Sequence, residues 1–264
     1  MVKKARRGQP AQGVPEVLGR FGFFARGVVY LFIGGIAARV ALLSRGHAKG
    51  PAGALQELLE GWNGRAALSV VAAGLLSLVV FRLADAVRAR SAVARVVSLV
   101  GAIGGLFLVG TSIRILLNVR RGGATALREW GARLMANPWG RGALALGGAI
   151  AVVAGLVEIA RAVLGKLPKD FVAAVIARDS RKWASRLARL GLLAHGTVVA
   201  LVGLSVFRAA VLTRPREIVE TGGALRKLTL MEGGPALFAV AAIGLLAYGL
   251  SMLVLAAHRR RRLR

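Results

Sequence analysis

Six long apolar stretches constrain this chain more than any other feature of its sequence. They fall at about 18–43, 66–87, 93–117, 142–165, 187–212 and 235–257. Each is long enough to cross the hydrocarbon core of a bilayer, which is about 30 Å thick and needs about 20 helical residues. Backbone groups in lipid must hydrogen-bond within the chain, and the alternation of a β-barrel is absent. We therefore predict an all-α, polytopic membrane protein with six transmembrane helices.

The net charge of the chain does not indicate a nucleic-acid binder. The formal charge is +27, but 56% of the residues are hydrophobic, and the 38 lysines and arginines mostly bracket the apolar stretches. A soluble basic protein would mix these residue types more evenly. The chain has no cysteine, which excludes disulfides, thiolate metal sites and covalent haem attachment.

The spans form three tandem pairs, which we predict to be helical hairpins. Segments 18–39, 93–114 and 187–208 align without gaps, and an arginine falls near both ends of each. The two arginines are nineteen residues apart, or about 28 Å of helix, which matches the hydrocarbon thickness. The first members of these pairs are Arg20, Arg95 and Arg189, and the second are Arg39, Arg114 and Arg208.

These repeats divide the chain into six segments. A basic tail at 1–16 precedes membrane repeats at 17–90 and 91–168, a basic amphipathic connector at 169–186 leads to a third repeat at 187–257, and a basic tail occupies 258–264. The segments 53–65, 125–141 and 223–235, before the second span of each repeat, have partly amphipathic spacing. They are either short interfacial helices or ordered loops packed on helix ends.

The distribution of basic residues predicts that both termini are cytoplasmic. With that orientation, twenty-two of the 38 lysines and arginines lie on the cytoplasmic side, including the tail after His258. We expect the protein in the bacterial cytoplasmic (inner) membrane.

The odd-numbered spans resemble a known bacterial family. The first span carries a pattern of arginines and glycines with one tyrosine, which is followed by "GAL" and then by "GR" before the next span. This pattern is similar to that of the bacterial domain of unknown function 1206, which is described as three tandem two-helix membrane units. The resemblance covers about 17–257 and implies an architecture without a mechanism. The second repeat departs most from this pattern, since Gly101 stands where the first repeat has Arg26. The pattern residues are Arg20, Gly22, Arg26, Gly27, Tyr30 and Gly34.

Arg26 and His195 are polar residues inside predicted spans, at equivalent positions of repeats one and three. Arg26 lies about 9 Å of helix beyond Arg20. Its guanidinium could form an anion or lipid-headgroup site, but we expect it to reach toward the cytoplasmic face, because arginine has a long stem. His195 lacks companion ligands, so we expect a hydrogen-bonded structural histidine rather than a metal or haem ligand.

A second group of charged residues lies on the even-numbered spans. Repeat one has Arg82 and Asp85, and repeat two has Glu158 and Arg161 at the aligned positions in reversed order of charge. The pairs either neutralise locally at i, i+3 or form bridges between repeats, from Arg82 to Glu158 and from Asp85 to Arg161.

No catalytic, cofactor or metal constellation is apparent, and we expect neither enzyme activity nor a cofactor. We predict a non-catalytic accessory, scaffold or lipid-interacting membrane protein. Its expected partners are anionic lipid headgroups and either another membrane protein or further copies of the chain. The alternative is a small transporter or channel, for an anion in view of Arg26.

Overall fold

The elements of this chain are helices throughout the part that is described. A computed structural model describes residues 14–43, 51–60, 63–89, 92–117, 123–165, 181–219, 221–229 and 232–258. The long helices are α1 (Val14–Leu43), α3 (Gly64–Arg88), α4 (Ala92–Leu116), α6 (Pro138–Val163), α8 (Arg181–Leu212) and α10 (Gly234–His258). The shorter elements are α2 (Pro51–Glu60), α5 (Gly123–Met135), α9 (Thr221–Thr229) and the 3-10 turn η1 (Pro215–Glu217).

Among the described residues, five helices are long and apolar enough to cross a membrane. They belong to α1, α3, α6, α8 and α10, while α4 contributes the shorter apolar stretch Gly101–Leu116. Five of the six predicted spans therefore meet the length and composition of a membrane helix. This confirms an all-helical protein with several apolar helices, as expected of a multi-pass membrane protein.

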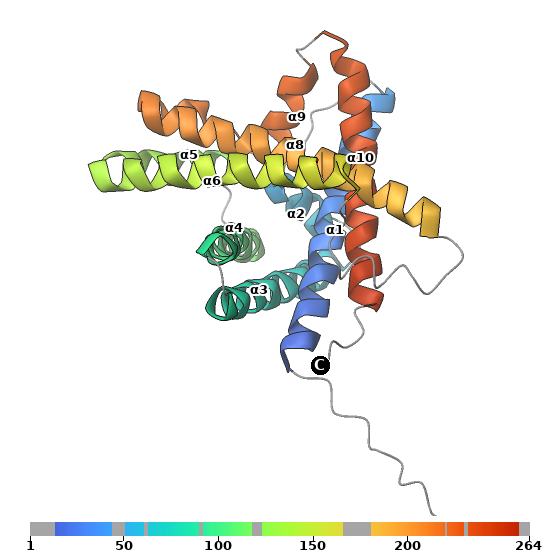
Figure 1. Ribbon diagram of the computed structural model, residues 1–264. Coiled ribbons are helices and arrows are strands. Elements are labelled where there is room, and N and C mark those ends of the chain that lie inside the picture. The colour runs from blue at the N-terminus through green and yellow to red at the C-terminus, as the bar shows by residue number, and fades with distance from the viewer. Residues whose placement is uncertain are drawn as a thin grey trace, which may run out of the picture.

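The long helices pack as three side-by-side pairs. The closest packed pair is α6 with α8, followed by α1 with α10 and by α3 with α4. In Figure 1, α6 and α8 run together across the picture, α1 and α10 cross them steeply, and α4 is seen close to end-on. Further contacts join α1 to α3 and α8 to α10, whereas α4 and α6 barely touch.

Glycines allow α1 and α3 to approach closely. A Cβ atom added to Gly22 would lie 2.7 Å from the Cα of Leu78, and one added to Gly74 would collide with Ala25. The higher-numbered residue of α1 meets the lower-numbered residue of α3 in these two contacts, so the two helices are antiparallel. Equivalent contacts recur between α8 and α10, at Gly191, Ala194, Gly244 and Tyr248.

The second repeat lacks these glycines. Val97 and Ile150 stand at the positions that are glycine in the α1–α3 and α8–α10 interfaces. Larger side chains at such a position hold two helices apart, because the backbones can no longer approach. The absence of both glycines from the sequence of the second repeat coincides with the sparse contact between α4 and α6.

A different pair of glycines joins α1 to α10. A Cβ atom on Gly27 would lie 3.0 Å from the carbonyl oxygen of Gly249, and one on Gly249 would lie 3.0 Å from that of Gly27. The aligned pair, Gly196 and Gly155, makes the same reciprocal contact between α8 and α6. Small residues at such crossings bring helix backbones into van der Waals contact.

The three arginines that open the repeats contact the C-terminal ends of neighbouring helices. Arg20 Nε donates to the carbonyl oxygen of Ala256 at 2.9 Å, at the end of α10. Arg95 Nη2 donates to Ala89, just beyond α3, and the Arg189 guanidinium lies against Gly165, just beyond α6. A cation is favourable there because helix C-termini leave carbonyl groups unpaired and carry partial negative charge.

The segments 53–65, 125–141 and 223–235 contain helices α2, α5 and α9. Leu55 of α2 and Leu225 of α9 are fully buried in the main apolar core, so these two helices pack on the long ones. These segments are therefore short helices rather than the ordered loops of the second alternative, and their placement at a membrane interface stays a prediction. Most of the connector at 169–186 and of the two tails lies outside the described residues.

Candidate functional site

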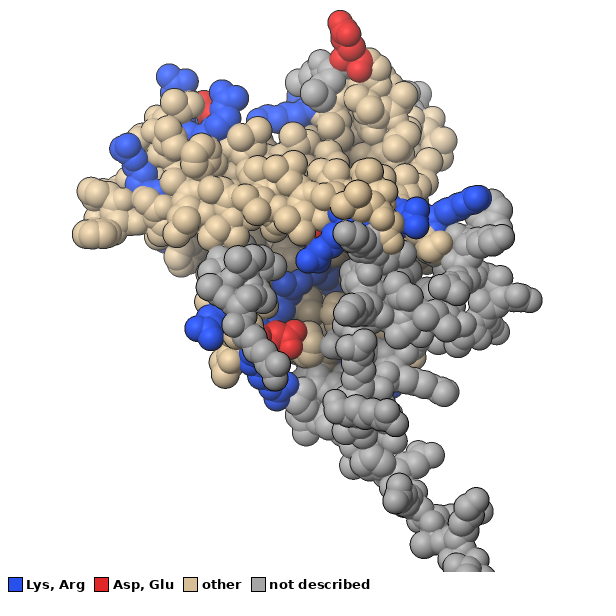
Figure 2. All heavy atoms as spheres, in the orientation of Figure 1, with Lys and Arg blue, Asp and Glu red and all other residues tan. Residues whose placement is uncertain are grey.

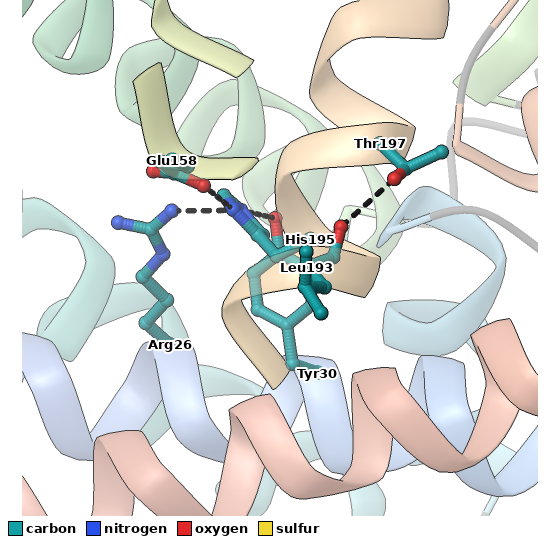
Figure 3. Close-up of polar contacts among 6 residues, drawn as sticks. All are labelled: Arg26, Tyr30, Glu158, Leu193, His195 and Thr197. Atoms are coloured by element: carbon teal, nitrogen blue, oxygen red, sulfur yellow. Dashed lines mark hydrogen bonds and ion pairs between the residues drawn. The ribbon is translucent and has the colours of Figure 1, made fainter. Parts of the chain in front are cut away.

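His195 is the buried centre of a polar network inside the helices. It lies on α8, has only 2% of its surface exposed, and its Nδ1 is 2.5 Å from Glu158 Oε2 on α6. The Glu158 side chain is 28% exposed. Figure 3 shows the carboxylate directed at the imidazole ring.

The opposite ring nitrogen of His195 meets two side chains of α1. Arg26 Nη2 and Tyr30 Oη are each 3.1 Å from His195 Nε2. A guanidinium can only donate, so Nε2 accepts the hydrogen bond from Arg26. It follows that Nδ1 carries the proton and donates it to Glu158, which makes His195 a neutral imidazole.

Two tyrosines enclose the histidine. The rings of Tyr248 and His195 stack with centroids 4.0 Å apart and an interplanar angle of 7°. Tyr30 meets both rings edge-on, and the Arg26 guanidinium carbon lies 5.7 Å from the Tyr30 centroid and 5.5 Å from that of Tyr248. Cations favour aromatic faces at such distances. We call Arg26, Tyr30, Glu158, His195 and Tyr248 the His195 cluster.

Arg82 brings a second guanidinium near the cluster from α3. It is half-buried and interacts electrostatically with Arg26, Glu158 and both tyrosines. Its guanidinium lies directly against Gly101 of α4, where an added Cβ atom would collide with Nη1. Among the described residues, no hydrogen bond or ion pair of Arg82 is formed.

These polar groups occupy equivalent positions of the repeats. Where α8 faces α6 the pair is His195 and Glu158, and where α4 faces α3 it is Gly101 and Arg82. The third equivalent pair is Arg26 on α1 and Met252 on α10. Equivalent positions of the three repeats thus carry different side chains, and the charged ones lie close enough to interact.

The structure corrects the expectation for Arg26. Its guanidinium donates to His195 rather than to a helix-end carbonyl or an acidic partner. The α1 helix packs mainly on α10 and α3, but the long Arg26 side chain reaches the His195 ring of α8. A buried hydrogen bond to that acceptor satisfies the guanidinium without a path of about 9 Å to the helix end. The expectation that His195 is hydrogen-bonded is confirmed.

The expected pairing of the even-span charges is also corrected. Glu158 is bound to His195 instead of to Arg82, because residues 82 and 158 each face the odd helix beside them rather than one another. Arg161 is exposed in the last turn of α6, and Asp85 is half-buried on α3. Neither Arg82–Asp85, Glu158–Arg161 nor Asp85–Arg161 is among the ion pairs between described residues.

Sequence reasoning missed the tyrosines of the cluster. Tyr30 entered only as part of a family pattern, and Tyr248 was not selected. A usable signal was present, since these are the only two tyrosines in the chain and both lie in apolar spans, where phenylalanine would cost less. A buried tyrosine hydroxyl usually has a polar partner.

The chemistry of the cluster is that of charge pairing rather than of metal binding. Both ring nitrogens of His195 are occupied by protein groups. Within the described ranges, no three His, Cys, Asp or Glu side chains gather in a way that could hold a metal ion. The network can hold helices together and can present positive charge, because it combines two guanidiniums with one carboxylate.

The cluster lies beside a sparse interface between two long helices. Glu158 is on α6 and Gly101 on α4, the two long helices that barely touch. Figure 2 shows uncharged atoms over α6 and, in the hollow beneath that band on the side of α3 and α4, basic and acidic side chains. Positive charge therefore lies within reach of the surface between these helices.

Comparisons with known proteins identify relatives but no activity. The family described as "Domain of Unknown Function (DUF1206)" matches residues 21–89 and 190–259. The chain is 26% identical over 245 residues to "Uncharacterized protein YxxB" of Bacillus subtilis (strain 168), covering 88% of this chain and 86% of that protein. No solved structure matches the chain.

Proposed function

The chain belongs to the DUF1206 family, and from that premise we propose that it is a non-catalytic, six-span scaffold of the bacterial cytoplasmic membrane that interacts with lipid. The observation that carries this proposal is the His195 cluster. Its hydrogen bonds and ring contacts join side chains of α1, α6, α8 and α10. Buried polar networks whose members satisfy one another rigidify a helical assembly.

Three tandem helical hairpins remain the proposed arrangement; the repeated contacts support the first and the third, whereas α4 and α6 barely touch. One family description matches both 21–89 and 190–259, which contain α1–α3 and α8–α10. The same glycine contacts recur in these two units. Arg95, aligned with Arg20 and Arg189, contacts the helix end before α4 as the other two contact α10 and α6. These equivalences favour α4 as the sixth span, despite its shorter apolar stretch.

The orientation is proposed with both termini in the cytoplasm. The hydrogen bond from Arg20 to Ala256 brings the start of α1 beside the end of α10, which supports both termini on one side of the membrane. The excess of basic residues around these ends supports the cytoplasmic side.

Interaction with lipid is supported by the surface of α6. Of the five candidate spans, α6 is the least buried, at 11% of its apolar window. Large apolar side chains are exposed along it, and outside a bilayer such a surface would contact water unfavourably. These side chains include Leu146, Val153, Leu156 and Val163.

A transporter for an anion is the second candidate, and one observation favours it. Arg82 and Arg26 place like charges near one another with one carboxylate between them. A membrane-embedded cation excess is a feature of anion pathways. Against this candidate, Arg26 and Glu158 are already engaged by His195.

Flux measurements distinguish the two candidates. Wild-type protein in liposomes should give chloride and phosphate flux equal to that of protein-free liposomes. Anion flux that is present in the wild type, retained in Arg88→Leu and lost in Arg26→Leu would overturn the scaffold proposal. Arg88 is a suitable control because it is exposed in the last turn of α3.

A further inference from the structure

Two guanidiniums near the centre of the fold share one carboxylate. Arg26 and Arg82 each carry a permanent positive charge, Glu158 carries one negative charge, and His195 is neutral because it accepts from Arg26. These four groups therefore carry a net charge of about +1 in a region of low dielectric constant, where like charges repel more strongly than in water.

The hydrogen-bonding capacity of the two arginines is largely unused. A guanidinium has five N–H donors. Arg26 directs one terminal nitrogen at His195, and Figure 3 shows the other pointing away from the ring. Arg82 makes no hydrogen bond to any described residue, although it is half-buried in an apolar helix. An acceptor is needed that the described part of the chain does not supply.

Glycines of α4 leave space beside Arg82. The guanidinium occupies the volume that a side chain at position 101 would fill. One turn further along α4, an added Cβ atom on Gly104 would meet nothing within 4 Å. Together with the sparse contact between α4 and α6, these glycines leave an approach to Arg82 from the side of the helices.

We propose that Arg82 and Arg26 bind one phosphate group that enters between α4 and α6. A phosphate offers several acceptor oxygens and at least one negative charge, and arginine pairs with it through parallel N–H donors. It would offset the excess positive charge and accept from the unused donors. The proposal rests on the proposed lipid interaction for its source, since an anionic lipid reaches this opening from the bilayer.

The depth of the site suits a headgroup. Arg26 lies six residues, or about 9 Å of helix, beyond Arg20, the first arginine of α1. A helix tilted from the membrane normal covers less depth than its length, and the helix pairs here cross steeply. Arginine stems and local thinning of the bilayer bring phosphates to such depths.

The proposal is tested by lipid binding to delipidated full-length protein in detergent, measured by native mass spectrometry. The probes are dioleoyl phosphatidylglycerol, dioleoyl phosphatidic acid and dioleoylglycerol, which share acyl chains; the last two differ only in the phosphate, and both phosphate-bearing lipids should bind alike. Wild type should bind them at least about tenfold more tightly than dioleoylglycerol, since hydrogen bonds to charged groups contribute about 1.5–3 kcal/mol each. Equal binding of phosphatidic acid and dioleoylglycerol would overturn the proposal.

Two variants of the site and one control locate the binding. Arg82→Gln should abolish the preference for phosphatidylglycerol, and Arg88→Gln, which removes the same charge six residues further along α3, should retain it. Gly101→Ala keeps every charge but displaces the Arg82 guanidinium, so it should weaken binding while the helix content by circular dichroism stays unchanged. Wild-type binding in both Arg82→Gln and Gly101→Ala would overturn the proposal.

Competition with inorganic phosphate identifies the source of the phosphate group. Retention of phosphatidylglycerol in excess phosphate assigns the site to a lipid headgroup, and its displacement assigns the site to the free ion; both outcomes support the proposed chemistry. The scaffold proposal fails separately, through anion flux in liposomes. A protein that transports phosphate through Arg82 would overturn the scaffold and leave the phosphate site standing.

Discussion

Within the described part of the chain, Glu158 is the carboxylate that faces His195 and, through it, Arg26. Replacing it with glutamine keeps a similar shape and an amide oxygen that can still accept from His195 Nδ1, but removes the charge. The position is partly exposed, so solvent screens part of the loss. The remaining loss of stability is the cost of burying the Arg26 guanidinium with no carboxylate nearby.

We predict that Glu158→Gln lowers the free energy of unfolding by about 1–3 kcal/mol. Thermal unfolding in detergent measures this. The control is Glu217→Gln, because Glu217 pairs with exposed Arg208 and Arg214 at 3.8 and 3.7 Å and such surface pairs contribute under about 1 kcal/mol. Adding Arg26→Met to Glu158→Gln should recover part of the loss. Equal effects of the two glutamine variants would contradict the importance of the cluster.

The protonation state of His195 gives a second prediction. Nδ1 should carry the proton and Nε2 should be an unprotonated acceptor, because Arg26 can only donate. ¹⁵N NMR of histidine-labelled protein at neutral pH reports this, with His195 assigned from a His195→Gln sample. Tyr30→Phe should leave the tautomer unchanged, since Arg26 still donates to Nε2. A proton found on Nε2 in the wild type would refute the assignment.

At this scale, sequence reasoning succeeded in selecting residues and failed in pairing them. Arg26, His195 and Glu158 were recognised because ionisable side chains are unfavourable inside apolar spans. Their pairing depends on which helix faces which, and equivalent repeat positions do not reveal that. A bridge between Arg82 and Glu158 was one of the two alternatives because these positions align, but the two side chains face different neighbouring helices.

Helix interfaces show how neighbouring glycines can have opposite roles. Gly147 and Gly148 are consecutive on α6, but only Gly148 faces α8, where an added Cβ atom would lie 2.6 Å from the backbone nitrogen of Phe207. At Gly147 nothing lies within 4 Å. Backbone atoms of a packed helix cannot move aside as the end of a flexible side chain can.

We predict opposite effects of alanine at these two positions. Gly148→Ala should destabilise the protein by about 1–3 kcal/mol, the usual range for overpacking. Gly147→Ala should be neutral or stabilising by up to about 1 kcal/mol, because alanine favours helix over glycine. Thermal unfolding of the two variants in the same detergent decides the matter, and a Gly148→Ala protein as stable as Gly147→Ala would contradict the observed α6–α8 packing.

The positions of the long helices could be predicted from hydropathy and repeat spacing. The long helices fall where the apolar stretches lie, and short helices were one of the two alternatives for the segments before α3, α6 and α10. The weak α4–α6 interface was not foreseen, because the departures in the second repeat were noticed at Gly101 and not at Val97 and Ile150. Only the contacts of Gly22 and Gly74 show that these positions control hairpin closure.

At the scale of the whole molecule, the chain ends and the helix pairing constrain the topology together. The hydrogen bond from Arg20 to Ala256 places the start of α1 beside the end of α10, which requires an even number of crossings between them. The five helices that qualify by composition are an odd number. Either α4 crosses as well, giving six spans, or one of the five does not cross.

We predict six crossings with both termini in the cytoplasm. The chain has no native cysteine, so single substitutions can be mapped with a membrane-impermeant maleimide on intact cells. Ser44→Cys, before α2, and Thr213→Cys, after α8, should react from outside, whereas Ser180→Cys, before α8, should react only after the cells are opened. A substitution between α4 and α5, Asn118→Cys, is the decisive one, because it is external only if α4 crosses. Asn118→Cys protected in intact cells, with Ser44→Cys reactive, would show that α4 does not span and would reduce the number of crossings.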